Sequence, residues 1–383
     1  MSVTAAGGFR ASGVAAGLKS TGAPDVALVV NDGPSASAAA VYTTNRCKAH
    51  PVLWSERASA DGIVRAVVLN SGGANCYTGP QGFATTHATA EQVAALLGIS
   101  ALDVVVCSTG LIGEPLDAGR LAGGVQAAAD ALGPEGGADA ATAIMTTDSH
   151  PKQALLRGDG WVVGGMAKGA GMLAPALATM LVVLTTDAVA DPASCDRALR
   201  EATRLTFDRL DSDGCMSTND TVVLMASGAS GVTPSAGELT DAVRAVCHDL
   251  AQQLMRDAEG ADHDIAIEVR GAVSEDDAVE VARAVARSNL FKAAVFGRDA
   301  NWGRILAAAG TTRAEFDPQL LDVAMNGVWI AKGGQPGESR DLVDLGPREV
   351  HVVVDLHAGE ATATVWTNDL THAYVHENSA YSS

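Results

Sequence analysis

Eight short apolar runs, most of them rich in β-branched residues, are spread along the 383-residue chain and constrain its fold more than any other feature. Runs of this length and composition are typical of strands. They lie at residues 26–30, 63–70, 103–109, 179–186, 221–227, 263–269, 351–356 and 362–366. Amphipathic helical patterns occur at 85–98, 196–205, 238–258 and 275–288. Because strands and helices do not alternate regularly, the sequence predicts an α+β layered fold rather than a doubly wound sheet.

Composition limits the size of the core and the kinds of molecule that the protein can bind. With 47% hydrophobic residues, the chain can bury a large core, arranged as one large domain or two. The glycine-rich stretches 133–137 and 333–337 are expected to be loops. A net charge of −19, from 26 basic and 45 acidic residues, leaves no basic patch for phosphates. The sequence therefore argues against nucleic-acid binding, and it slightly favours cationic over anionic small-molecule substrates.

No segment or motif points to a membrane, a metal or export. The uncharged stretch 169–186 is long enough to span a bilayer, but Gly169, Gly171 and Pro175 interrupt it, so a loop followed by a buried strand is favoured. The six scattered cysteines lack the CxxC spacing of a zinc site and do not form a disulfide framework. With no export signal at the N-terminus, we expect a cytoplasmic protein that binds no metal.

A lone threonine, Thr179, lies between Ala178 and the apolar run 180–184. Threonine is β-branched and common in strands, so spacing alone indicates an ordinary strand residue. A small preceding residue, a backbone restrained by Pro175 and a following strand also suit an attack of the Thr179 hydroxyl on the Ala178 carbonyl. An N-to-O acyl shift and ester hydrolysis would then release a chain beginning with Thr179. Its α-amino group, with a reference pKa of about 7.7–8.0, could act as the base for the adjacent hydroxyl.

Seven segments together resemble one enzyme family. The stretch KGAGMLAPALATMLVVLTTD at 168–187 closely resembles the self-cleavage segment of the ornithine acetyltransferases, also called bifunctional glutamate N-acetyltransferases. Agreement extends along nearly the whole chain, in CSTGLIGEPL (107–116), AIMTTDS (143–149), DSDGCMSTNDT (211–221), AEGADH (258–263), FGRDANWGRI (296–305) and HENSAYSS (376–383). The loop NSGGANCYTG at 70–79 departs from the more frequent family pattern NSGNANACTG.

The resemblance implies roles for individual residues. Thr179 matches the nucleophile that becomes acetylated, and cleavage would fall between Ala178 and Thr179. Thr109 and Gly110 match the pair that forms the oxyanion hole. The implied substrate contacts are Thr146, Lys168, Thr179, Glu259, Asn378 and Ser383, with Thr147 an open alternative to Thr146.

The residues by themselves leave simpler roles open. Thr109 and Gly110 could form an ordinary turn after a strand. Lys168, the only charged residue in 161–186, could be either a surface anchor or a deliberately buried charge. Glu259 could be a solvated acid at the end of a helix.

The resemblance also implies a fold, an assembly and a reaction. It implies a layered α-β-β-α arrangement built from two fragments, residues 1–178 and 179–383, assembled as a heterotetramer with two copies of each. The implied reaction is acetyl transfer from N-acetylornithine to glutamate through an acetyl-threonine, in arginine biosynthesis. Acetyl-CoA is a second acetyl donor for some members of the family, and no cofactor is expected.

Two other functions stay open. An N-terminal-threonine amidohydrolase or aminopeptidase would use the same nucleophile with water as the acceptor. A non-enzymatic binding protein would keep Thr179 buried in an uncut chain.

Overall fold

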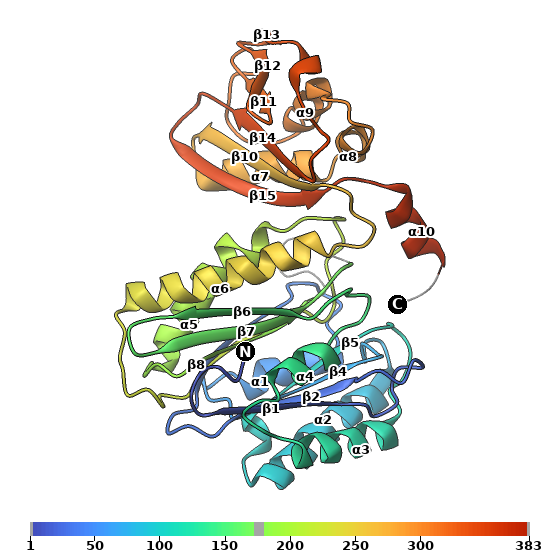
Figure 1. The fold of residues 1–383 in the computed structure, drawn as a ribbon, viewed down its shortest axis with the longest axis vertical. Coiled ribbons are helices and arrows are strands. Elements are labelled where there is room, and N and C mark those ends of the chain that lie inside the picture. The colour runs from blue at the N-terminus through green and yellow to red at the C-terminus, as the bar shows by residue number, and fades with distance from the viewer. Residues whose placement is uncertain (1–2, 172–179, 381–383) are drawn as a thin grey trace.

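Two sheets lie face to face, with helices on both outer sides (Figure 1). The computed structural model describes residues 3–171 and 180–380; Ala178, Thr179 and Ser383 therefore lie outside the described residues. The α+β class expected from the sequence is confirmed by the mixture of helices and antiparallel and parallel strands.

The first sheet has four strands in the order β1-β2-β4-β5. Only the pairing of β4 with β5 is parallel. Three helices cover its outer face, and a fourth, α4, packs against β1 and β2 and also touches the second sheet. The bounds are β1 Phe9–Val14, β2 Val26–Asn31, β4 Ala66–Ser71, β5 Val104–Thr109, α1 His50–Ala58, α2 Gly79–Leu97, α3 Ala118–Asp130, α4 Gly137–Ala143 and the short 3₁₀ helix Ala101–Asp103.

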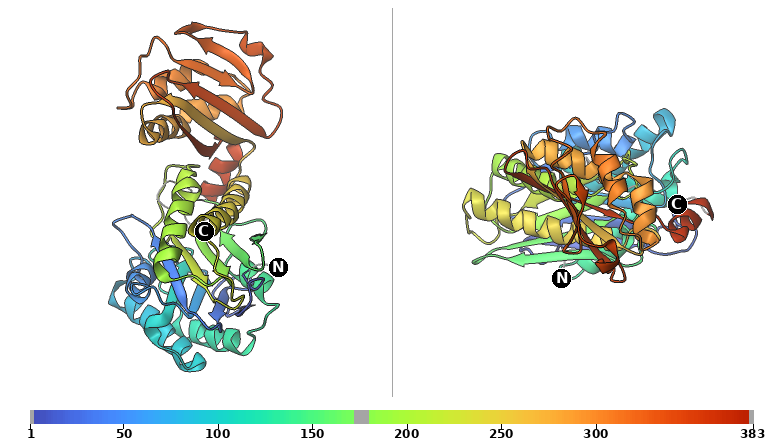
Figure 2. Two further views of the ribbon diagram at one scale, coloured as in Figure 1. Left: turned by 90° about the vertical axis from the view of Figure 1, so that its left-hand side faces the viewer. Right: turned by 90° about the horizontal axis from the view of Figure 1, so that it is seen from above.

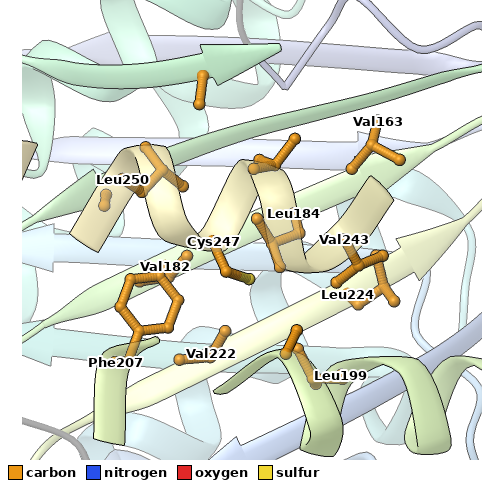
Figure 3. Packing of buried hydrophobic residues seen from close by; sticks show 14 of the residues in the cluster. Val163, Val182, Leu184, Leu199, Phe207, Val222, Leu224, Val243, Cys247 and Leu250 are labelled. Atoms are coloured by element: carbon orange, nitrogen blue, oxygen red, sulfur yellow. The ribbon is translucent and has the colours of Figure 1, made fainter. Parts of the chain in front are cut away.

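The second sheet has five strands in the order β3-β9-β8-β7-β6, and only β8 and β9 pair in parallel. Two long helices, α5 and α6, cover its outer face, and their side chains form a core with the strands, including Val182, Leu184, Cys247 and Leu250 (Figure 3). The bounds are β3 Ser37–Tyr42, β6 Lys152–Arg157, β7 Val162–Lys168, β8 Leu181–Thr186, β9 Thr221–Ala226, α5 Pro192–Leu205, α6 Ala236–Arg256 and the 3₁₀ helix Phe207–Arg209.

Side chains from both sheets meet in a shared core between them. Val29 and Leu69 of the first sheet belong to the same buried cluster as Val183 and Val223 of the second. Strands buried on both faces carry apolar residues at successive positions, which explains the continuous runs seen in the sequence. The resulting order through this part of the molecule is helices, sheet, sheet, helices.

A third sheet, with its own core, stands at one end of this sandwich (Figure 2). Its six strands follow the order β13-β12-β11-β14-β10-β15. The last helix, α10, leaves this part and returns toward the sandwich (Figure 1). The bounds are β10 Asp264–Ala272, α7 Glu275–Ala286, α8 Asn289–Phe296, α9 Trp302–Ala309, β11 Asp322–Met325, β12 Val328–Lys332, β13 Gln335–Pro336, the 3₁₀ helix Arg340–Leu342, β14 Glu349–Asp355, β15 Ala361–Asn368 and α10 His372–Ala380.

The strand register brings the ends of several strands together. Lys168, at the end of β7, pairs with Leu181 at the start of β8, and Leu181 pairs with Thr221 at the start of β9. Segment 169–180 therefore joins two neighbouring antiparallel strands inside the second sheet. Within residues 3–171 and 180–380, no helix has the length and apolar character needed to cross a membrane.

Candidate active site

A pocket of about 620 Å³, part of it open to solvent, lies beside the ends of β5 and β7. Six of the residues singled out in the sequence line it, although they come from distant parts of the chain: Thr109, Gly110, Thr146, Lys168, Glu259 and Asn378. Thr147 lines the same pocket, so the choice between Thr146 and Thr147 stays open. The remaining lining residues are Ala74, Ile112, Gly171, Ser217, Thr218 and Asn219.

The end of β5 places Thr109 and Gly110 at the pocket wall. The carbonyl of Thr109 accepts a hydrogen bond from the N–H of Gly73 at 3.0 Å, which fixes the backbone at this point. Gly110 has a φ of 131°, and a Cβ there would lie 2.5 Å from the nitrogen of Gly73. Only glycine can make this turn without displacing the neighbouring loop.

Lys168 is a buried cation in the pocket wall, not a surface anchor. Its residue is 1% exposed, and its Nζ donates to the Thr109 hydroxyl at 3.2 Å. Because that hydroxyl oxygen accepts from the ammonium, its own proton is free to point toward another acceptor. Burial lowers the pKa of Lys168, and the carboxylates of Asp148, Asp220 and Glu259 oppose this shift. The pair therefore offers one hydroxyl donor backed by a positive charge.

Asp148 anchors the charged part of the pocket, and sequence reasoning assigned it no role. Its two oxygens accept from the N–H of Gly169 at 2.7 Å and from the N–H of Thr146 at 2.9 Å. The buried Lys152 also donates to Asp148 at 2.6 Å and to Asp257 at 2.5 Å. Burial acts to raise the pKa of the Asp148 carboxyl, but Lys168 and Lys152 outweigh it and bring the pKa down to about 2.

Another part of the pocket lining joins Glu259 to the last helix. Asn378 of α10 donates to Glu259 at 3.0 Å, and the Glu259 N–H bonds the carbonyl of Ala170 at 3.0 Å. Gly260 follows with a φ of 61°, and a Cβ there would lie 2.2 Å from the nitrogen of Tyr374 in α10. The helix can approach only because residue 260 lacks a side chain. Glu259 is therefore part of the pocket rather than a solvated acid at a helix end.

Ser217, Thr218 and Asn219 also line the pocket, and sequence reasoning missed their role. The Asn219 side chain donates to the carbonyls of Ala74 and Ser108 at 2.7 and 2.8 Å, which ties this part of the lining to the end of β5. Asp220 accepts from the N–H of Met180 at 2.9 Å. Asn219 and Asp220 lie in the stretch DSDGCMSTNDT, so the family motif was the available signal.

One described end of segment 172–179 borders this pocket, because Gly171 lines it. At the other end, the Met180 N–H donates to Asp220, which directly follows the lining residue Asn219. Within residues 3–171 and 180–380, no group of three His, Cys, Asp or Glu side chains is placed to hold a metal ion. The pocket instead combines a cation, a carboxylate and hydroxyl and amide donors, a set that suits a small zwitterionic molecule.

Comparisons with known proteins agree along the whole chain. The ArgJ family model matches residues 10–383. The chain is 65% identical to the arginine biosynthesis bifunctional protein ArgJ of Streptomyces avermitilis, covering 100% of both chains, and 55% identical to that of Mycobacterium leprae, covering 100% of this chain and 96% of the relative. A solved structure of ornithine acetyltransferase from Mycobacterium tuberculosis, in complex with ornithine, is 54% identical with a TM-score of 0.45, over 47% of this chain and 96% of that one. The chain belongs to the ArgJ family, the family of the arginine biosynthesis bifunctional proteins ArgJ.

Proposed function

We propose that this chain transfers the acetyl group of N-acetylornithine to glutamate through an acetyl ester on Thr179. The observation that carries the proposal is the convergence of Thr109, Lys168, Glu259 and Asn378 on one pocket, which Gly171 at one described end of segment 172–179 also lines. Glu259 suits the ammonium groups of ornithine, and Lys168 suits a carboxylate. The pocket therefore matches the charges of both amino-acid substrates.

The proposed reaction has two acyl transfers at one threonine. The Thr179 hydroxyl attacks the acetyl carbonyl of N-acetylornithine, and its proton passes to the Thr179 α-amino group. The carbonyl oxygen becomes an oxyanion that the Thr109 hydroxyl and the Gly110 N–H stabilise. The C–N bond then breaks, and ornithine leaves with the proton. Glutamate attacks the acetyl ester in the second half, which predicts ping-pong kinetics.

The nucleophile arises by a cut between Ala178 and Thr179. The proposed products are residues 1–178 and 179–383, which together form the layered α-β-β-α arrangement and assemble as a heterotetramer with two copies of each. No cofactor takes part. We place the enzyme in the cytoplasm, where arginine biosynthesis draws on its substrates.

A denaturing gel with N-terminal sequencing tests the cut, and product analysis tests the reaction. We expect two fragments, the second beginning TMLVV, and N-acetylglutamate plus ornithine as products. Thr179→Ala should stay uncut and inactive, whereas Thr179→Ser keeps a hydroxyl and should still be cut. Active enzyme in a single intact band would overturn the mechanism. Free acetate or a cleaved peptide in place of N-acetylglutamate would instead identify a hydrolase.

Acetyl-CoA is proposed as a second acetyl donor. A second depression, of about 1320 Å³ with the open solvent in its mouth included, shares Gly110, Thr146 and Thr147 with the first pocket and is where we place the bulkier donor. Thr142 lines this cavity and not the first, so Thr142→Trp should slow acetylation from acetyl-CoA more than from N-acetylornithine. Ala138→Trp, one turn earlier on the same helix, is the matched control. Equal rates for both donors in Thr142→Trp would exclude this cavity as the entry path.

A further inference from the structure

Asp148 and Lys152 form a buried ion pair next to Lys168. Lys152 is fully buried, and its Nζ donates to Asp148 at 2.6 Å. In the β6–β7 ladder, Lys152 pairs with Ala167, the residue before Lys168. Asp148 accepts the N–H of Gly169, the residue after Lys168, at 2.7 Å. The ion pair is therefore attached to the chain on both sides of Lys168.

The charge of Lys168 determines which way the Thr109 hydroxyl points. As an ammonium, Lys168 has no lone pair to accept with, so its Nζ donates to the Thr109 oxygen, at 3.2 Å, and leaves the hydroxyl proton for an oxyanion. As a neutral amine, the same nitrogen has a lone pair that can accept that proton. Loss of the Lys168 proton therefore lets the hydroxyl turn away from the oxyanion.

The charges around Lys168 decide how firmly it holds its proton. Burial lowers the pKa of Lys168; Asp148 opposes this shift more than any other charge, Lys152 adds to it, and Asp220 and Glu259 oppose it. Burial acts to raise the pKa of Asp148, but Lys168 and Lys152 bring it down to about 2, so this carboxylate is ionised at neutral and alkaline pH. The charged groups that face Lys168 are Asp148, Lys152, Asp220, Glu259 and Lys19.

We infer that Asp148 is a positioning residue for the oxyanion donor: it keeps Lys168 protonated, and Lys168 keeps the Thr109 hydroxyl turned toward the oxyanion. The inference rests on the proposed function, in which Thr109 donates to the oxyanion of both acyl transfers. Lys168 and Thr109 line the pocket, whereas Asp148 and Lys152 do not. The ion pair therefore acts on the reaction through Lys168, and Lys152 fixes the carboxylate in the place from which it acts.

The alkaline limb of the kcat–pH profile for ornithine release tests this role. Activity should fall as Lys168 loses its proton, so a change that lowers the pKa of Lys168 moves the limb to lower pH. Asp148→Asn removes a negative charge and should move the limb down by about 1–2 pH units. Lys152→Met removes a positive charge and should move it up. Damage to packing alone would lower kcat at every pH and would not move the limb in opposite directions.

Lys168→Arg isolates the lysine itself. Arginine stays charged up to a pH of about 12, so the alkaline limb should disappear in this variant. Adding Asp148→Asn to Lys168→Arg should not bring the limb back. If the limb came from an amino group of the substrate instead, it would stay in place in all of these variants.

A second measurement does not depend on turnover. The chain has six lysines, so in protein labelled with ¹³C-lysine the Lys168 signal can be assigned by its loss in Lys168→Met. The pKa of Lys168, followed by NMR, should be lower in Asp148→Asn than in the wild type and higher in Lys152→Met. Asp257→Asn is the matched control, because Asp257 also pairs with Lys152, at 2.5 Å, but is not among the charges that shift the pKa of Lys168. It should leave that pKa nearly unchanged.

An unmoved alkaline limb in Asp148→Asn would overturn the inference, whether or not the pKa of Lys168 moves. If Asp148→Asn does not fold, an alkaline limb that persists in Lys168→Arg would overturn it as well. Both results leave the proposed function intact. Wild-type protein that is active without being cut would instead overturn the proposed function itself.

Discussion

At the scale of single residues, Thr109 connects the buried charge of the pocket to the proposed oxyanion hole. The Thr109 hydroxyl oxygen accepts a hydrogen bond from the Lys168 ammonium at 3.2 Å, so the hydroxyl proton is free to be donated to an oxyanion. Thr109→Ala should lower kcat by a factor on the order of 10²–10³ and affect KM less, because the donor acts mainly in the transition state. Steady-state rates of ornithine release measure this, with Thr109→Ser as the control that keeps the hydroxyl. An unchanged kcat in Thr109→Ala would remove Thr109 from the oxyanion hole.

Asp148, in the same pocket, makes the stability of the folded protein depend on pH. Its pKa in the folded protein is lowered to about 2, mainly because Lys168 and Lys152 overcome the effect of burial. A carboxyl with a lowered pKa stabilises the fold above its unfolded pKa of about 3.9, and this contribution disappears as pH falls toward about 2. Asp148→Asn should therefore lower the free energy of unfolding at neutral pH by about 2 kcal/mol or more.

The measurement is the difference in unfolding free energy between wild type and Asp148→Asn, determined by denaturant titration at several pH values. The gap should be constant above about pH 5 and should narrow between about pH 4 and pH 2. Asp196→Asn is the control, because the ion pair that Asp196 forms in the described part of the chain is an exposed i,i+4 pair with Arg200 at 2.8 Å. A gap that does not change with pH would mean that the charge of Asp148 is not what stabilises this site.

At the scale of elements, the polar helix α10 completes the pocket. Chain ends are often loosely held, yet α10 packs on Gly260 and sends Asn378 to Glu259. In the proposed mechanism, self-cleavage depends on Ala178, Thr179 and the oxyanion donors, whereas substrate capture depends on this helix. Deleting residues 378–383 should leave the cut largely intact and sharply reduce acetyl transfer.

Fragment bands on a gel and ornithine release from the same truncated protein decide this prediction. Asn378→Ala should reproduce most of the loss. Ser379→Ala is the matched control, because among the described residues the Ser379 hydroxyl bonds within its own helix, to the carbonyl of His376 at 3.3 Å. Full transfer activity after truncation would show that neither Asn378 nor Ser383 contacts the substrate.

The elements also show what sequence could and could not predict. The eight apolar runs all contain strands, because strands buried on both faces or packed on one core keep a strong pattern. β3 (SAAAVY) and β7 (VVGGMAK) went unpredicted, since alanine and glycine weaken the pattern and pairing with β9 and β8 imposes their conformation. The stretch 333–337, expected to be a loop, contains the two-residue strand β13.

The sequence likewise predicted some residues of the candidate site and missed others. Thr109, Lys168, Glu259 and Asn378 were found through a family motif, and the structure places them in one pocket. Asp148 was not found, because its importance depends on Lys152 and on Asp257, more than a hundred positions away along the chain. Contacts between distant segments leave no local pattern, so only the folded chain shows them.

At the scale of the whole molecule, the second sheet mixes strands from both sides of the proposed cut. β3, β6 and β7 precede it, β8 and β9 follow it, and the ladders β7–β8 and β3–β9 cross between the two fragments. Separating the fragments would expose the core under α5 and α6. We therefore expect them to elute together in size-exclusion chromatography, to separate on a denaturing gel, and to lose structure in one thermal transition. Independent elution of either fragment in native buffer would contradict the pairing of strands between the two fragments in this sheet.

The pairing of β7 with β8 also affects whether the mature protein can refold. Before the proposed cut, folding is unimolecular, because segment 169–180 tethers the two strands. After it, unfolding yields two separate polypeptides, and recovery becomes a second-order encounter whose rate depends on concentration. The broken peptide bond is not restored by refolding. The lifetime of the cut, folded enzyme is then set by its rate of unfolding rather than by a folding equilibrium. Each molecule can fold as one uncut chain only once, before the cut.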